Sequence, residues 1–262
     1  MGRVVATALC RLGNQMFIAA AARTFAKRTG REFWGLVYTD VKSDYPPEQE
    51  RIMRNIRYVN RNSVKGYYKV PHGNHLCNGF PNVDAEDVWL EDYFQDATCI
   101  DKDVAYDLFK PYESILSEIQ KLYGDLSDYV CVNVRRGDYL LRGNPELGFR
   151  TLSKDDIVKI LKKYFPKEEV LFISDDIQWC KANFKGKRYA FADKPCHYKP
   201  EMDLYLQTQC KANVISNSTF SWWGAYLNDH AEKVVCPWPW FKDNKIDQMT
   251  NILPENWIKY EG

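Results

Sequence analysis

Short apolar runs alternate along the chain with segments of helical periodicity, most regularly in the second half. The runs at residues 129–134 and 170–173 have the length of buried strands, and each is followed by a segment with helical spacing of apolar residues. Repeated strand–helix units predict a parallel sheet with helices on both faces. The predicted strands are residues 4–9, 32–37, 129–134, 170–173, 188–191, 213–216 and 233–236, and the predicted helices are residues 14–29, 153–165, 175–184, 200–210 and 218–227.

Residues typical of helix ends support these assignments. Ser153 and Asp156 form a variant capping box, and Gly30 stands where a helix C-terminus favours glycine. Asn14 and Ser218 are good N-cap residues for the helices that they precede. A break near residues 108–128 is predicted to separate two α/β halves.

Polar segments follow four of the predicted strands, at the sheet edge where open α/β folds bind ligands. They are residues 11–17, 132–139, 172–176 and 215–225. Hydroxyl side chains and free N–H groups at a strand-to-helix turn suit a phosphate group. A single segment of this kind is more often a well-capped buried helix, but four at four strand ends indicate a binding site.

Taken in order, the four segments resemble glycosyltransferase family 11, the α-1,2-fucosyltransferases that use GDP-fucose. They read RLGNQMF, VNVRRGDY, FISDD and ISNSTFSWWGA, and WLEDYFQ at residues 89–95 resembles the family's aromatic motif. The resemblance spans about residues 11–227. It implies a GT-B-like α/β fold, in which two Rossmann-like domains have the cleft between them. We expect residues 1–110 to form the mainly acceptor-side domain and residues 111–262 the nucleotide-sugar-binding domain.

The arginine pair carries the expected catalytic chemistry. A guanidinium grips phosphate oxygens bidentately and can stabilise charge on a departing diphosphate without a metal. The resemblance implies that Arg135 contacts the diphosphate, whereas Arg136 could hold its loop through Asp138. Arg135 and Asp138 are therefore the candidate catalytic residues. Asp138 is the leading carboxylate for proton removal, with Glu91 and Asp92 as alternatives from the acceptor side.

Further candidates bind the nucleotide sugar. Gly13 and Asn14 occupy the first predicted strand-to-helix turn, where glycine permits close backbone approach. A carboxylate can accept from guanine N1–H and N2–H together, so one of Asp175 and Asp176 is expected to read guanine. Asp175 could instead cap the next helix.

The last candidates surround the expected phosphate position. Ser218, Thr219 and Ser221 are candidates to donate to phosphate oxygens, whereas the tryptophans beside them are more often core residues. The resembled family usually has histidine where this chain has Asn133, close to the bound nucleotide. Asparagine keeps a donor and an acceptor but does not titrate near neutral pH.

Composition excludes several other classes of protein. A net charge of +1 over 262 residues gives no reason to expect a nucleic-acid partner. No apolar run approaches the ~18–20 residues of a membrane span, and the N-terminus has no targeting pattern. We therefore expect a cytoplasmic enzyme of bacterial or viral type with at most peripheral membrane association. The eight cysteines form no CxxC pair and are interpreted as reduced thiols.

No metal or other cofactor is expected. The DxD spelling at residues 101–103 opens a helix-like segment, where acidic residues commonly oppose the helix dipole. His72, His75 and Cys77 have no evident fourth ligand and stand in a turn-like context.

The leading hypothesis is an inverting transferase that moves L-fucose from GDP-fucose to the 2-hydroxyl of a galactoside. One alternative is a transferase of another GDP-linked deoxysugar, suggested by Asn133. Another is a catalytically inactive carbohydrate-binding or nucleotide-sugar-binding protein of the same fold. The acceptor depends on residues 40–82, which contain no interpretable motif.

Overall fold

The computed structural model describes residues 1–37, 51–70, 80, 82–141, 151–196, 200–241 and 251–262. These residues form two compact units. The first contains Met1–Lys110 and also residues 251–254, which the sequence analysis assigned to the second domain. The second unit begins at Pro111. Residues 251–254 return to the first unit, where the Asn251 carbonyl accepts a hydrogen bond from the Ala97 amide at 2.8 Å.

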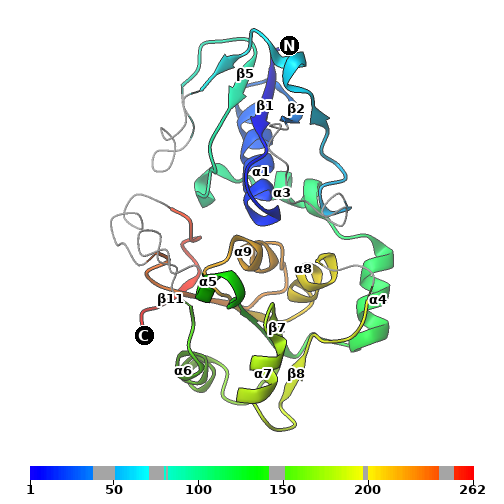
Figure 1. The fold of residues 1–262 in the computed structure, drawn as a ribbon, viewed down its shortest axis with the longest axis vertical. Helices are drawn as coiled ribbons and strands as arrows, with labels where there is room; N and C mark the ends of the chain where they lie inside the picture. Colours follow the sequence, from blue (N-terminus) through cyan, green and yellow to red (C-terminus); the bar gives the residue numbers. More distant parts are fainter. Residues whose placement is uncertain (38–50, 71–79, 81, 142–150, 197–199, 242–250) are drawn as a thin grey trace. The chain divides into compact units, whose positions relative to one another are not determined.

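The first unit is a parallel five-stranded sheet in the order β3-β2-β1-β5-β4. Helix α1 packs against β1 and β2, and α3 packs against α1 (Figure 1). The elements are β1 (Arg3–Thr7), α1 (Leu12–Arg28), β2 (Glu32–Val37), β3 (Tyr58–Val59), η1 (Arg61–Val64), β4 (Tyr68–Lys69), β5 (Val88–Leu90), η2 (Ala97–Cys99) and α3 (Lys102–Phe109).

The second unit is a parallel six-stranded sheet in the order β11-β10-β9-β6-β7-β8. Numbered from its own first strand, this is the 3-2-1-4-5-6 order of a Rossmann sheet. The elements are α4 (Glu113–Tyr123), β6 (Tyr129–Val134), α5 (Gly137–Leu141), α6 (Lys154–Tyr164), β7 (Glu169–Ser174), α7 (Ile177–Asn183), β8 (Tyr189–Phe191), α8 (Glu201–Thr208), β9 (Ala212–Val214), α9 (Thr219–Tyr226), β10 (Lys233–Pro237) and β11 (Ile258–Tyr260).

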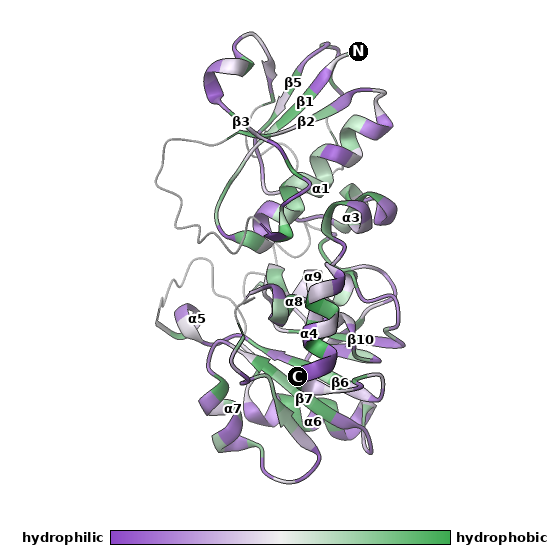
Figure 2. Ribbon diagram, turned by 90° about the vertical axis from the view of Figure 1, so that its right-hand side faces the viewer, coloured by the Kyte–Doolittle hydropathy of each residue, from purple (hydrophilic) through white to green (hydrophobic). Residues whose placement is uncertain are grey.

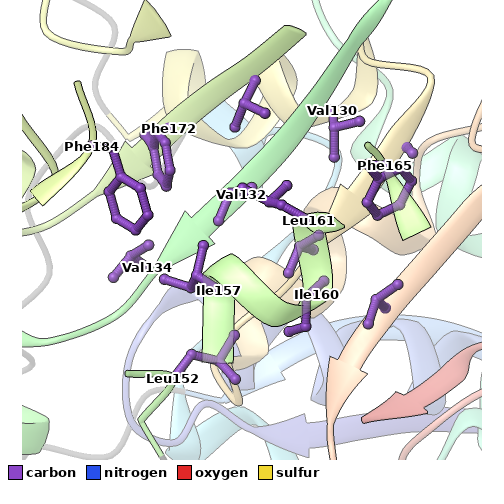
Figure 3. Packing of buried hydrophobic residues seen from close by; sticks show 14 of the residues in the cluster. Val130, Val132, Val134, Leu152, Ile157, Ile160, Leu161, Phe165, Phe172 and Phe184 are labelled. Carbon is purple, nitrogen blue, oxygen red and sulfur yellow. The ribbon is translucent and has the colours of Figure 1, made fainter. Parts of the chain in front are cut away.

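Alternating residues of β6 hold the second unit together. Val130, Val132 and Val134 belong to the same buried cluster as Ile157 and Ile160 of α6 (Figure 3). The intervening β6 residues Cys131 and Asn133 are absent from that cluster, because successive side chains of a strand point to opposite faces of the sheet. Figure 2 shows the central strands β6 and β7 largely in the colour of hydrophobic residues. Strands buried on both faces explain the continuous apolar runs in the sequence.

Several predicted elements are confirmed with small shifts at their ends. The capping box of α6 is complete, with Ser153 and Asp156 in reciprocal hydrogen bonds. Gly30 has φ 66°, as its place beyond the end of α1 requires. Asn14 is not an N-cap, however, because α1 begins two residues earlier and has Arg11 at that position.

Other elements were missed. The break expected near residues 108–128 contains α4, which packs against α8. Strands β3 and β4 have two residues each, and β5 and β11 have three. Runs this short carry too little periodicity to be recognised in a sequence.

The cysteines of the described residues act mainly as small apolar side chains. Five of the seven are buried, and none forms a disulfide. Burial raises the pKa of Cys180 to about 11 and that of Cys236 to about 12, so both remain thiols near neutral pH. Cys77 lies outside the described residues, as do His72 and His75.

The described part of the chain contains no helix that is both long and apolar enough to cross a bilayer.

Candidate functional site

The candidate site of the second unit lies where the strand order reverses. From β6 the chain continues to β7 and β8 on one side, and it later returns to β9 on the other side of β6. In open α/β sheets, ligands bind outside the carboxyl ends of the strands at such a switch point. Residues 135–138 follow β6 and residues 215–218 follow β9, so both predicted motifs flank this position.

Asn133 joins the two strands at the switch point. Its side chain is buried at 7% exposure, and its Oδ1 accepts a hydrogen bond of 3.1 Å from the Ser216 hydroxyl. A histidine could offer only one ring nitrogen as the acceptor of this bond. Asn133 therefore has a structural role at the expected nucleotide position, whatever it contributes to binding.

Two carboxylates hold the guanidinium of Arg135. Its Nη2 lies 2.5 Å from Oδ1 of Asp138, and its Nη1 lies 3.1 Å from Oδ2 of Asp175. The guanidinium carbon also lies 5.3 Å from the ring centroid of Tyr139. All three charged side chains are about a quarter exposed, so this cation is fixed in orientation while remaining partly accessible. The buried Nε of Arg135 has no hydrogen-bond partner among the described residues.

Arg136 is anchored to the start of α7. Its Nε donates to Oδ2 of Asp176 at 3.2 Å, and its guanidinium lies 4.0 Å from the ring centroid of Trp179. Its backbone amide donates to Oδ1 of Asp175 at 2.9 Å. The sequence suggested that Arg136 holds its loop through Asp138; in the structure Arg136 bonds to Asp176, and Asp138 pairs with Arg135.

The two aspartates after β7 have different structural roles. Asp176 is the N-cap of α7, and its Oδ1 accepts from the Trp179 amide at 3.1 Å. The cap was suggested for Asp175, which instead bonds to the loop after β6. Both carboxylates are thus engaged within the protein. Guanine recognition by either one would use the remaining acceptor positions of its oxygens.

Gly137 is required by the close approach of Asp175. A Cβ atom at position 137 would lie 2.5 Å from Oδ2 of Asp175, a distance that real Cβ atoms essentially never show. The glycine therefore permits Asp175 to reach Arg135 across the loop.

The hydroxyl residues at the start of α9 fall into two classes. Ser218 is the N-cap by position, but its side chain makes no capping hydrogen bond, and Thr219 is the first helical residue. Both are partly exposed. Ser221 is fully buried, and its Oγ has no partner among the described residues. The helix N-terminus with Ser218 and Thr219 is thus the accessible part of this motif, and it favours an anion.

The neighbouring tryptophans are core residues, as the sequence suggested. Trp222 and Trp223 are fully buried and pack edge to face, with ring centroids 4.9 Å apart.

Three residues of this region were missed from the sequence. Tyr139 donates from its hydroxyl to the Asn217 carbonyl at 3.4 Å, and Asn217 in turn donates from Nδ2 to the Trp240 carbonyl at 3.0 Å. Trp179 supports Arg136. Trp179 could have been found in the sequence because it stands three residues after Asp176, the N-cap of α7, and so lies in the first turn of that helix.

The first unit has its own polar cluster at the ends of β1 and β5, which are neighbours. Gly13 and Asn14 lie in the first turn of α1, and Oδ1 of Asn14 accepts from Nε2 of Gln95 at 3.0 Å. Cys10 and Phe94 have φ values of 55° and 48°, the only positive values for non-glycine residues in the described chain. Positive φ in such residues is a strained state that is common at functional sites.

The other candidate carboxylates also have structural partners. Glu91 forms an ion pair with Lys69, and Oδ1 of the buried Asp92 accepts from the Tyr93 amide at 2.7 Å. Asp101 caps α3 by accepting from the Val104 amide. A hydrogen bond from Lys27 is the main reason why the pKa of Asp101 lies below its usual value. The described residues include no cluster of three or more His, Cys, Asp or Glu side chains that could hold a metal ion.

Comparisons with known proteins identify the family of this chain. The family model described as Glycosyl transferase family 11 matches residues 11–261. The O-antigen biosynthesis glycosyltransferase WbnK of Escherichia coli is 33% identical over 187 residues, which cover 64% of this chain and 59% of that protein. An alpha-1,2-colitosyltransferase of Escherichia coli is 33% identical over 141 residues, which cover 50% of this chain and 47% of that protein. The chain thus spans about half the length of these relatives.

A solved structure supports the fold. NodZ, an alpha-1,6-fucosyltransferase from Bradyrhizobium whose crystals were soaked with GDP-fucose, has a TM-score of 0.55 at 13% identity. The match covers 89% of this chain and 94% of NodZ. The two parallel α/β sheets and this likeness establish the GT-B fold.

The close approach at Gly137 predicts a coupling that can be measured. Gly137→Ala should destabilise the protein by about 1–3 kcal/mol, because the new methyl group must displace the Asp175 carboxylate. In an Asp175→Ala background the same substitution should cost much less, since the clash is gone. Urea unfolding of the four proteins of this double-mutant cycle measures the coupling. Equal costs in both backgrounds would show that the contact is not constraining.

Proposed function

Because the chain belongs to glycosyltransferase family 11, we propose that it transfers L-fucose from GDP-fucose to the 2-hydroxyl of a galactoside, with inversion at the anomeric carbon. The first unit would take the acceptor side and the second the nucleotide sugar. The observation that carries this proposal is the guanidinium of Arg135, fixed by two carboxylates at a switch point beside the N-terminus of α9. Fixed donors beside a helix N-terminus suit a diphosphate.

Leaving-group stabilisation would be the main catalytic contribution. As the glycosidic bond breaks, negative charge grows on the diphosphate, and Arg135 is already oriented to donate to it. The N–H groups at the start of α9, with the hydroxyls of Ser218 and Thr219, would receive the remaining phosphate oxygens.

The position of Asp138 bears on its proposed role. The Oδ1 atom of Asp138 already pairs with the Arg135 guanidinium at 2.5 Å. We therefore assign Asp138 first to the orientation of Arg135, and proton removal to its second oxygen or to a carboxylate of the first unit. Asn133 could not serve as the base, because an amide does not accept a proton near neutral pH.

A second donor is supported by a specific relative. The alpha-1,2-colitosyltransferase aligns with half of this chain at 33% identity, so transfer of another GDP-linked deoxysugar is the alternative. A side-by-side turnover assay with GDP-fucose and GDP-colitose separates the two donors. A protein that binds either donor but neither transfers nor hydrolyses the sugar would be the inactive binding protein of the same fold.

Guanine recognition predicts a nucleotide preference. GDP at 100 times its Kd should stabilise the folded protein by about 2.7 kcal/mol, and UDP and CMP should not raise the melting temperature. The reason is that a carboxylate at Asp175 or Asp176 can accept two hydrogen bonds from guanine but not from a pyrimidine base. Differential scanning fluorimetry with the three nucleotides at equal concentration measures this preference. Stabilisation by UDP equal to that by GDP would contradict it.

Metal independence is a further part of the proposal. Turnover should persist in excess EDTA, because the arginine and the helix N-terminus would supply the positive charge that a metal supplies elsewhere. The measurement is the initial rate with and without chelator. Loss of turnover that Mg²⁺ or Mn²⁺ restores would overturn the arginine-only mechanism.

Arg135→Ala should lower kcat by roughly 10²–10³, or about 3–4 kcal/mol, which is the usual cost of losing one transition-state donor. Arg135→Lys should not restore the rate, since an ammonium group cannot replace the two Nη atoms that bridge Asp138 and Asp175. Steady-state kinetics give kcat and KM, and Lys185→Ala is the control at an exposed cation of the same unit. A normal kcat with only a raised KM for the donor would show that Arg135 binds substrate and transition state equally.

A further inference from the structure

A strongly basic surface lies on the first unit, beside the aromatic motif at residues 89–95. Residues 51–69 contain six lysines and arginines and no aspartate or glutamate. Removing six positive charges from the net charge of +1 leaves −5 on the rest of the chain. The charge asymmetry is therefore large although the chain as a whole is almost neutral.

Three of the four exposed cations of this segment lie over aromatic rings. The guanidinium carbon of Arg57 lies 5.4 Å from the ring centroid of Trp34, and that of Arg61 lies 5.9 Å from the ring centroid of Trp89. Nζ of Lys69 lies 5.1 Å from the same Trp89 ring. Contacts of this kind restrict long side chains before any ligand binds.

These side chains form one surface. The ring of Trp34 stacks on Tyr67, and both pack against the same apolar cluster that contains Trp89. Arg3 adds a further cation 4.7 Å from the ring centroid of Trp34. We define the basic–aromatic surface as Arg3, Trp34, Arg57, Arg61, Lys65, Tyr67, Lys69 and Trp89.

Most of this charge is available to an external anion. Arg57, Arg61 and Lys65 are exposed and have no ion-pair partner within the described residues, whereas Lys69 pairs with Glu91.

We propose that the basic–aromatic surface docks the protein on an anionic phospholipid bilayer. Each lysine or arginine at an anionic membrane surface contributes about fivefold to binding. Trp34 and Trp89 already face cations of the protein, so they are not open platforms for nucleic-acid bases. An anionic bilayer needs only the peripheral cations that this surface presents.

The surface also adjoins the candidate acceptor side. The Lys69–Glu91 ion pair connects it directly to residue 91, at the carboxyl end of β5. A bilayer docked here would lie close to the polar cluster at the ends of β1 and β5. Lipid binding is measured without turnover, so the experiment tests the docking proposal separately from the proposed transferase activity.

Vesicle sedimentation tests the proposal. The protein should bind vesicles of phosphatidylglycerol and phosphatidylcholine (about 3:7) but not phosphatidylcholine alone. The triple variant Arg57→Gln, Arg61→Gln, Lys65→Gln should bind about 10²-fold more weakly. The matched control Lys159→Gln, Lys162→Gln, Lys167→Gln removes three exposed charges from the second unit and should bind as the parent does.

Thermal melting checks that the variants are folded, which is expected because every substituted cation is exposed. Equal binding by the parent and the basic-surface triple variant would overturn the proposal. Equal loss in the control variant would overturn it too, because net charge rather than this surface would then govern binding. Tighter binding to duplex DNA than to the anionic vesicles, at equal concentration of anionic groups, would assign the surface to nucleic acid instead.

Discussion

The arrangement of the candidate site depends on the ion pairs of Arg135. Asp138 approaches the guanidinium from the same loop, and Asp175 approaches from the end of the neighbouring strand. The second contact requires a residue without a Cβ at position 137. The same carboxylate also accepts the Arg136 amide, so one aspartate fixes both the backbone and the side chain of the loop. The loop after β6 and the start of α7 therefore behave as one structural element.

This arrangement has an electrostatic consequence for anion binding. The cluster contains two arginines and three aspartates, so its formal charge before a ligand binds is −1. The net charge of this cluster therefore does not attract a diphosphate. A bound diphosphate would share Arg135 with Asp138 and Asp175, which already form ion pairs with it. The N–H groups and hydroxyls at the start of α9 carry no such compensating charge. They are the donors that could make the first favourable contacts, with Arg135 contributing most as charge grows on the leaving group.

The sequence predicted the parts of this structure that depend on long apolar runs and on local chemistry. Strand β6 and the capping box at Ser153 belong to this group, because burial on both faces and a bond between residues three apart are visible locally. The assignment of the α7 N-cap to Asp175 was wrong by one residue. Helix ends are uncertain by one or two residues even when they are assigned from structures. The Arg135–Asp175 contact joins residues 40 positions apart, so only the assembled sheet reveals it.

The basic–aromatic surface illustrates a different limit. A net charge of +1 correctly describes the whole chain but conceals the six lysines and arginines of residues 51–69, a segment without aspartate or glutamate. Screening confines the influence of exposed charges to about 8–10 Å at moderate ionic strength, so a partner responds to the local patch and not to the total. The sequence shows where these cations stand, but only the structure places Arg57 over Trp34 and Arg61 over Trp89. Those rings convert a run of charges along the chain into a surface of defined geometry.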